Sequence, residues 1–232
     1  MKHLLVLIAM ASAACGVESS SSLLTSGMSG EMTAQSIGDG TASVTAELFD
    51  GDPLQLIFVD LGSGDELIAH HGSESQTMQK LQLLTIVQYG ATFDNAADGD
   101  TFSVELQRTV DAGAPSSTMT LPPSFDLDPL PATASRATDL SLTWSPTSSE
   151  PMSWQVTGPC IATADGAIGG GDTGSTTIPA ASIQLAAGET NTSCQATVTV
   201  SRTLAGTIDS HFGEGGNADG AQVRTATFTT TL

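Results

Sequence analysis

The sequence predicts an all-β protein, with two β-sandwich domains that follow an export signal and a flexible tether. Short apolar stretches alternate with polar residues at a period of two, which is typical of half-buried strands. Gly, Pro, Asn and Asp residues separate these stretches and form turns. Aromatic residues make up only 4% of the chain. Thr, Val and Gly are abundant instead, and this composition favours strands and turns over helices.

Residues 1–14 have the layout of a secretory signal peptide. Lys2 and His3 form a short basic region, and residues 4–10 form an apolar region followed by small residues. The apolar run is far shorter than the roughly 20 residues that span a bilayer. We therefore expect an exported chain without a transmembrane helix.

The small residues end at Cys15. The sequence SAAC resembles the lipobox of bacterial lipoproteins, which implies that Cys15 is acylated and becomes the first mature residue. Ser12 stands where lipoboxes usually carry a larger aliphatic residue, and ASA at 11–13 also fits an ordinary signal-peptidase site. In that alternative the protein is secreted or periplasmic with a spare thiol. Gly16 follows the Cys in place of Asp, and the resemblance then implies delivery to the outer membrane. Such an anchor carries several acyl chains, which makes it stable.

Composition divides the rest of the chain into three parts. Residues 15–36 are rich in Ser and Gly, and we expect a flexible tether there. Residues 37–125 form the predicted first domain, with clean alternation over 41–49 and 101–109. The Pro-rich stretch after residue 125 marks a boundary. The apolar segment 81–93 favours a strand, although residues 78–87 could form a short helix.

Residues 126–232 form the predicted second domain. The stretches that define it are LSLTWSP, MSWQV, STTIP, CQATVTVSRT and VRTATFTT. In this order they resemble the strands of the fibronectin type III and immunoglobulin-like superfamily over about 100 residues. The chain as a whole is similar to exported lipoproteins of Gram-negative bacteria, a likeness that implies no particular activity.

The cysteines point to one disulfide. If Cys15 is acylated, Cys160 and Cys194 remain as an even pair in an exported chain. Strand parity directs both side chains to the core. The bond would close a loop of about 35 residues and contribute roughly 4 kcal/mol. Antibody-type domains join their second and sixth strands instead, so we expect a sandwich with its own cross-link. A metal site is the weaker alternative, because no second Cys or His lies nearby.

The net charge of −19, with only six Lys and Arg, limits the partners. A strongly acidic surface repels nucleic acid and anionic headgroups. We therefore expect no nucleic acid, and membrane contact through the lipid anchor only. The charge is typical of a soluble exported surface. The partner itself, in the envelope or outside the cell, stays unknown.

We expect no enzyme, no cofactor and no metal site. The chain has none of the motifs of nucleophilic, zinc or phosphate chemistry. His70 and His71 are neighbours on a predicted strand and point to opposite faces, so they cannot chelate one metal, and we expect both at the surface. His211 lies in a Gly-rich segment that we interpret as a hairpin loop of the second domain.

The sequence thus favours a non-catalytic, lipid-anchored envelope protein that acts as a binding or structural module. The alternative is a calcium-dependent adhesion or matrix component that uses the loop of Asp94, Asp98 and Asp100. That loop fits a calcium motif only in part, since Ala96 occupies an alternate position and Glu105 is twelfth only when counting begins at Asp94.

Overall fold

The structure, a computed structural model, describes residues 16–231, and its regular secondary structure is strand apart from three short 3₁₀ turns. The predicted signal peptide and Cys15 lie outside the described residues. The strands of the N-terminal part are β1 Gly16–Ser19, β2 Met28–Ser36, β3 Thr41–Asp50, β4 Ile57–Asp60, β5 Glu66–His71, β6 Glu74–Thr77, β7 Gln79–Leu83, β8 Ile86–Asp94, β9 Thr101–Gln107 and β10 Ala114–Thr120. Short 3₁₀ turns are η1 Ser20–Ser22, η2 Thr25–Gly27 and η3 Pro53–Gln55.

The C-terminal part continues with shorter strands and two long ones. These are β11 Asp126–Leu127, β12 Thr133–Ser135, β13 Leu140–Ser145, β14 Met152–Thr157, β15 Ala164–Ile168, β16 Ser175–Ile178, β17 Cys194–Ala205 and β18 Gly216–Thr231. The all-β prediction is confirmed. None of the described helices is long and apolar enough to cross a membrane.

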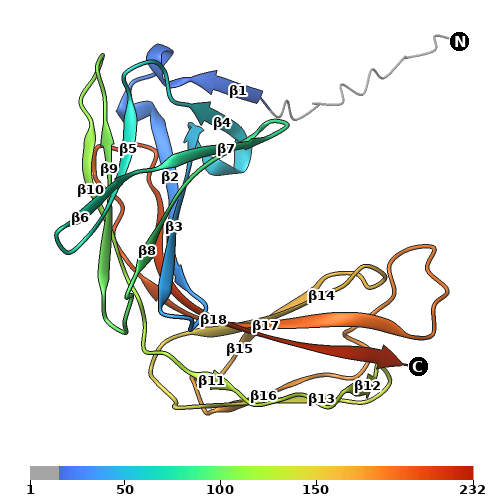
Figure 1. Cartoon of the computed structure of the whole chain (residues 1–232). Helices are drawn as coiled ribbons and strands as arrows, with labels where there is room; N and C mark the ends of the chain where they lie inside the picture. The colour runs from blue at the N-terminus through green and yellow to red at the C-terminus, as the bar shows by residue number, and fades with distance from the viewer. Residues whose placement is uncertain (1–15, 232) are drawn as a thin grey trace, which may run out of the picture.

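One large sheet runs through the whole molecule in the order β1-β4-β3-β2-β18-β17-β14-β15, with β7, β8 and β12 attached. The sheet β10-β9-β5-β6 covers its N-terminal half, and the sheet β11-β13-β16 covers its C-terminal half (Figure 1). The result is a bent molecule with two sandwich arms, which we name the first arm and the second arm. The large sheet lines the inner side of the bend.

Alternation of side chains explains both cores. In β3 the four inward residues Ala42, Val44, Ala46 and Leu48 are fully buried, as the period-two pattern predicts. In β17 the inward residues from Cys194 to Val200 are buried in the same way. The two cores are separate clusters, one built on β2, β3, β5, β8 and β9 and the other on β13, β14 and β17.

The predicted tether is wrong for residues 16–36. β2 is a central strand that pairs with β3 on one side and with β18 on the other. Its alternation of buried Met28, Met32 and Ala34 with polar residues places it in the first core. The Ser and Gly content of the segment concealed this pattern. The described chain is therefore ordered from Gly16 onward.

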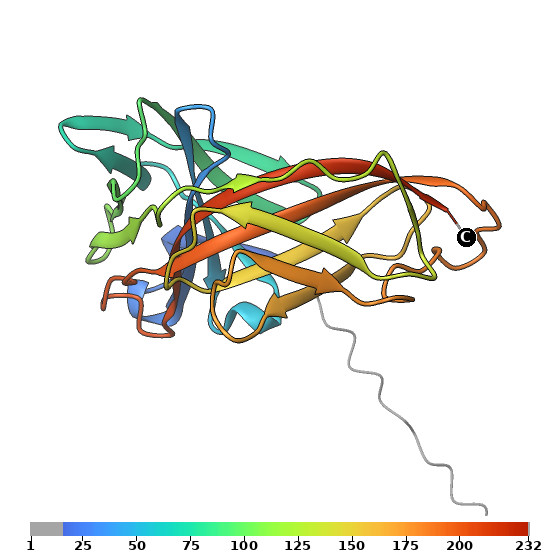
Figure 2. The same ribbon diagram turned by 90° about the horizontal axis from the view of Figure 1, so that it is seen from below.

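The predicted domain boundary is also wrong in part. Leu121 belongs to the first core and Phe125 to the second, so the chain does change arms near residue 125. However, Phe212 and Ala218 pack in the first core. β18 pairs with β2 through residues 216–222 and then continues beside β17 along the second arm (Figure 2). Gly220 allows this crossing, because a Cβ there would lie 1.7 Å from the Thr120 carbonyl oxygen.

Candidate functional site

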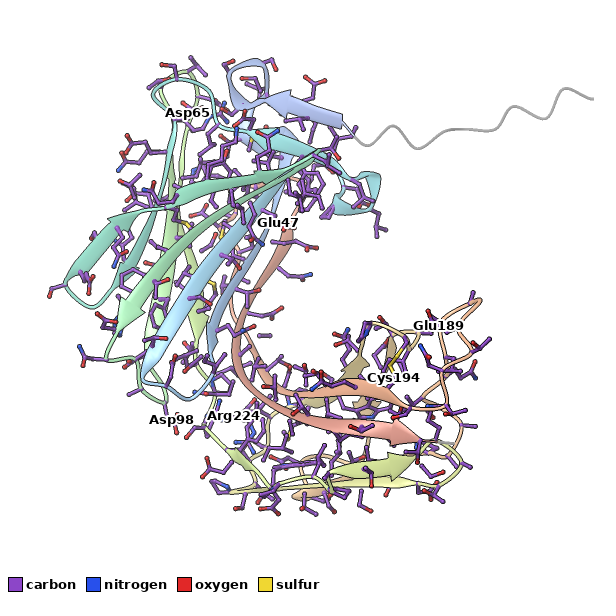
Figure 3. All side chains as sticks on the ribbon, turned by 45° about the vertical axis from the view of Figure 1, so that its right-hand side comes forward. Glu47, Asp65, Asp98, Glu189, Cys194 and Arg224 are labelled. Atoms are coloured by element: carbon purple, nitrogen blue, oxygen red, sulfur yellow. A yellow bond between two sulfur atoms is a disulfide. The ribbon has the colours of Figure 1, made fainter. Side chains whose placement is uncertain are left out.

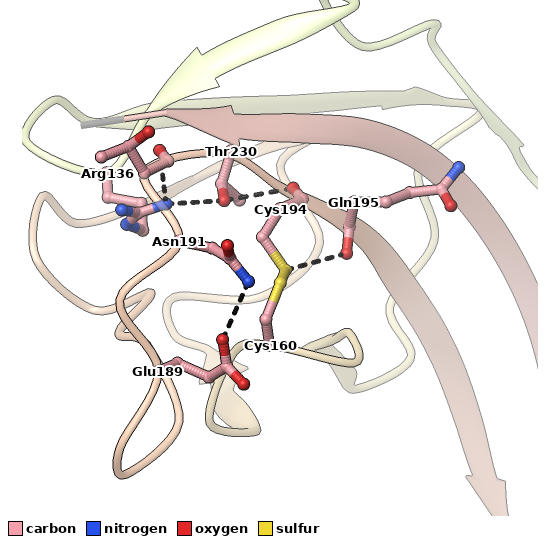
Figure 4. The surroundings of a disulfide bond; sticks show 8 residues. Arg136, Cys160, Glu189, Asn191, Cys194, Gln195 and Thr230 are labelled. Atoms are coloured by element: carbon pink, nitrogen blue, oxygen red, sulfur yellow. Dashed lines mark hydrogen bonds between the residues drawn. A yellow bond between two sulfur atoms is a disulfide. The ribbon is translucent and has the colours of Figure 1, made fainter.

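The disulfide joins Cys160, which follows β14, to Cys194, the first residue of β17. The Cα atoms are 6.1 Å apart. Thr230 on β18 donates its hydroxyl to the Cys194 carbonyl, and Arg136 donates to the same Thr230 hydroxyl (Figure 4). The bond therefore closes the far end of the second arm. The predicted pairing is confirmed.

Removing this cross-link is expected to lower the free energy of unfolding by about 2–4 kcal/mol, because the unfolded chain regains the freedom of the closed loop. The test is chemical denaturation of the Cys160→Ser/Cys194→Ser variant beside the oxidised protein. Reduced wild-type protein serves as the matched control for the serine substitutions. Equal midpoints for oxidised and reduced protein would contradict this expectation.

A buried ion pair fixes the N-terminal segment to the first arm. Arg108 donates from Nε to Asp65 Oδ2 at 2.8 Å, and both side chains are almost fully buried. Its Nη2 donates to the carbonyl oxygens of Ser20 and Leu23, at 2.6 and 2.9 Å. Nη1 reaches the Thr25 hydroxyl at 3.0 Å. One guanidinium thus holds the whole stretch that contains η1 and η2.

Asp65 is held as a carboxylate by several donors. Burial by itself raises the pKa of Asp65, but hydrogen bonds from Thr109 and Ser20 and the charge of Arg108 outweigh it, and the pKa lies below its usual value. Asp172 and Asp209 have lowered pKa values for the same reason, since hydrogen bonds outweigh their burial. In all three, the folded state favours the ionised form.

These carboxylates predict a loss of stability in acid. Their folded pKa values lie below the unfolded value of about 3.9, so the unfolded chain binds more protons as the pH falls. Stability should be fully present near neutral pH and should fall below about pH 4. Urea denaturation between pH 7 and pH 3 measures the free energy of unfolding as a function of pH. In the Asp65→Asn variant this free energy should depend less on pH.

Glu47 provides a control of opposite sign. Burial, together with the charge of Glu31, raises the pKa of Glu47 even though Gln88 donates a hydrogen bond to it. Its ionisation therefore weakens the fold near neutral pH, and Glu47→Gln should raise stability there. A variant that instead loses stability at neutral pH would show that the assignment is incorrect.

His70 and His71 point to opposite faces of β5, as predicted. His70 Nδ1 lies 2.8 Å from the Ser75 hydroxyl, and its Nε2 lies 3.3 Å from Glu105. This Ser–His–Glu chain spans the outer face of β6, β5 and β9, where the His70 side chain is 31% exposed. The three side chains come from neighbouring antiparallel strands, so we assign these contacts to cross-strand pairing.

His71 is not the surface residue that the sequence predicts, because its ring packs against core phenylalanines. Its ring stacks on Phe102 with centroids 4.5 Å apart and meets the edge of Phe93. Nε2 lies 3.0 Å from Asp100. His71 therefore covers one end of the first core.

His211 also lies elsewhere than predicted. The segment between β17 and β18 does join an antiparallel pair of strands, as predicted, but it packs on the first arm through Ile208 and Phe212. His211 Nδ1 lies 2.7 Å from Asp209 Oδ1, and Asp209 Oδ2 accepts from the Ser116 amide. His211 borders a shallow depression of about 480 Å³ beside Arg108 and Pro115. The imidazole is thus oriented by Asp209, which also binds the Ser116 amide of the first arm.

The acidic loop does not converge into a calcium site. Asp98 accepts from the amide and hydroxyl of Ser124, and Asp100 accepts from the Ala97 amide and faces His71. Within residues 16–231 no group of three or more His, Cys, Asp or Glu side chains could hold a metal ion. The described loop therefore serves the junction between the arms.

The junction is built around Arg202, which the sequence did not single out. This side chain is fully buried and donates to Asp172 Oδ2 at 2.5 Å. It also donates to three carbonyl oxygens, those of Pro123, Ser124 and Pro146. The guanidinium lies 4.9 Å from the centroid of the Phe125 ring. The segment that links the arms is therefore bound directly by the second arm.

The first arm binds the same linking segment from the other side. Asp98 Oδ2 accepts the Ser124 amide at 2.9 Å, and Asp98 Oδ1 accepts from Gln222 on β18 at 3.2 Å. Arg224 lies over the Phe125 ring at 5.3 Å. Asp98 and Arg224 lie next to each other at the bend (Figure 3). These contacts on both sides indicate a fixed bend.

The inner side of the bend is a polar face, which we name the inner face. In the second arm it consists of alternate residues of β14, β17 and β18: Ser153, Gln155, Thr197, Thr199, Ser201, Thr225 and Thr227. In the first arm, Glu31 and Glu47 lie directly opposite each other on β2 and β3. Glu47 lies on the inner side in Figure 3. Like charges placed opposite each other weaken a sheet, and Gln88 donates a hydrogen bond to Glu47 at this position.

Comparisons with known proteins give no family. Neither the protein-family comparison nor the comparison with curated proteins yields a match. Among solved structures, an I-band fragment of titin matches at 9% identity and a TM-score of 0.25, covering 84% of this chain and 63% of that fragment. Fibronectin(III)-like modules of Clostridium thermocellum CbhA match at 9% identity and a TM-score of 0.23, covering 86% of this chain and 90% of theirs. At these TM-scores the likeness supports no assignment of family or function.

Proposed function

We propose that this chain is a non-catalytic protein of the bacterial cell envelope that presents a rigid, bent pair of β-sandwich arms. The observation that carries the proposal is the single sheet that runs through both arms, with its bend fixed by Arg202. Separate domains move relative to each other by default. A shared pair of long strands and a buried junction oppose such motion, so the chain is suited to a fixed spacing or a fixed binding surface.

The inner face supports a binding role. It combines hydroxyl and amide side chains on neighbouring strands, an arrangement that suits a partner rich in polar groups. The short distances along the ladders, such as Gln155 beside Thr199 and Thr199 beside Thr225, keep these groups in register. The Ser75–His70–Glu105 contacts join three neighbouring strands, and we interpret them as cross-strand pairing rather than as a catalytic arrangement.

The proposal includes an anchor at Cys15, delivery to the outer membrane, and a partner in the envelope or outside the cell. The lipobox resemblance supports the anchor. The described chain is ordered from Gly16, so with an anchor at Cys15 the arms would lie directly at the membrane rather than on a long tether.

The intact mass of the mature protein from the membrane fraction, measured with and without reductant, tests the proposal. A chain that starts at Cys15, carries acyl mass and gains two hydrogens on reduction would support anchor and disulfide together. A start without acyl mass, in the soluble fraction, would indicate the secreted or periplasmic alternative. A melting temperature that rises with millimolar calcium would favour the adhesion alternative.

A further inference from the structure

Two neighbouring segments of the first arm expose an unusual number of leucines. The turn η3 carries Leu54, which is 87% exposed, and Leu56 ends it half-exposed. The β7–β8 hairpin exposes Leu81, Leu83, Leu84 and Ile86, with Leu84 at 88%. We name these six residues the apolar tip. Apolar side chains that gather at one place on a surface mark an interaction site.

Backbone conformation makes two of these leucines more informative. Leu56 and Leu84 have φ angles of 53° and 57°, in the left-handed region. That region favours Gly and Asn, and a hairpin turn such as the one after Leu83 usually carries them. Compared with Gly or Asn, leucine at these positions makes the turn less stable and the surface less soluble. Local rules are broken in this way mainly at functional sites.

The apolar tip lies where the described chain begins. β1 pairs in parallel with β4, and Gly16 is the partner of Ile57, the residue after Leu56. Lys80 on β7 donates to Asp60 on β4 at 2.7 Å, and the Tyr89 hydroxyl of β8 accepts from the Leu61 amide at 2.8 Å. These contacts hold the hairpin along β4. In Figures 1 and 3 the hairpin end, η3 and the start of β1 lie side by side.

We infer that the apolar tip inserts into the interfacial layer of the bilayer that holds the lipid anchor. The inference rests on the proposed anchor, because Cys15 is the residue before Gly16 and its acyl chains would enter the membrane next to the tip. Apolar side chains seat about 5–10 Å deep at such an interface. The anchor keeps the tip at high local concentration, so weak insertion suffices. The net charge of −19 favours zwitterionic over anionic headgroups.

The test uses the full mature chain, with acylation of Cys15 verified by mass, in phosphatidylcholine vesicles. Leu84→Cys carries an environment-sensitive fluorophore, since the remaining cysteines form the disulfide. Ile37→Cys is the matched control, because Ile37 is also apolar and 57% exposed but lies beyond the opposite end of β2. Vesicles that contain doxyl-labelled phosphatidylcholine should quench the probe at 84 by about half, as expected for interfacial depth, and should leave the probe at 37 nearly unchanged.

A second variant separates membrane contact from folding. Asparagine is tolerated in the left-handed conformation at this turn, so the Leu84→Asn substitution should leave the melting temperature unchanged. Quenching of a probe at Leu54→Cys should nevertheless fall in this background. If the probe at position 54 is quenched as strongly in the Leu84→Asn background as without this substitution, the hairpin does not contribute to membrane insertion.

The remaining outcomes are distinct. Acylated protein with equal quenching at 84 and 37 overturns the inference and leaves the anchor intact. Absence of acyl mass overturns the anchor and the inference with it. A blue shift at position 84 without vesicles that grows with protein concentration would show that a second copy of the chain covers the tip, which also overturns insertion into lipid.

Discussion

Replacing Arg202 with Met is expected to lower the free energy of unfolding by about 3–5 kcal/mol, because it leaves the buried Asp172 carboxylate without its partner. It also removes the donors to three carbonyl oxygens of the linking segments. Each buried acceptor left unsatisfied adds to the loss. Chemical denaturation measures the change.

Two variants make this result specific. Arg224→Met removes the other guanidinium over the Phe125 ring, but Arg224 is only half-buried, so it should lose much less stability. The double variant Arg202→Met/Asp172→Asn should recover part of the lost stability, because it no longer buries an unpaired carboxylate. Small-angle scattering should show a broader range of shapes for Arg202→Met. A profile identical to wild type would show that the bend does not depend on Arg202.

Replacing Arg108 with Met is expected to have an effect of similar size, about 3–5 kcal/mol, because Asp65 is left buried and unpaired. Its effect should be local as well. Arg108 is the donor that holds the carbonyls of Ser20 and Leu23, so hydrogen exchange should become faster in residues 19–27.

The exposed pair of Lys80 and Asp60 supplies the comparison. Both side chains are 36% exposed, and Lys80→Met should change stability by less than about 1 kcal/mol. An Arg108 variant with wild-type exchange in residues 19–27 would contradict the proposed role of this ion pair. It would show that β1 and β2 hold the segment without it.

The strands that alternate cleanly could be predicted from the sequence. Residues 42–48 of β3 and 194–200 of β17 face inward at every second position, because one face of each strand is buried. β2 has the same alternation, but its Ser and Gly content is also typical of a flexible tether. The sequence predicts one strand where the structure has the β7–β8 hairpin, because the turn at Leu84 lacks the Gly or Asn that marks most hairpins.

The polar contacts that decide the architecture could not be predicted in the same way. The Cys160–Cys194 bond is predictable from the sequence, because a chain with so few cysteines leaves little choice of partner. Arg108 and Arg202 each bind residues about 80 positions away in the sequence, such as Thr25 and Pro123. Periodicity reports which face of a strand is buried, and it carries no information on which distant carbonyl a buried guanidinium will meet.

The shared strand β18 has a consequence for how the chain folds. The sheet of the first arm needs β18 beside β2, so strands near the two ends of the chain must meet before that arm is complete. Closing so long a loop is slow, and contacts of this kind delay folding. A growing chain cannot finish the first arm on the ribosome until its last strand has emerged.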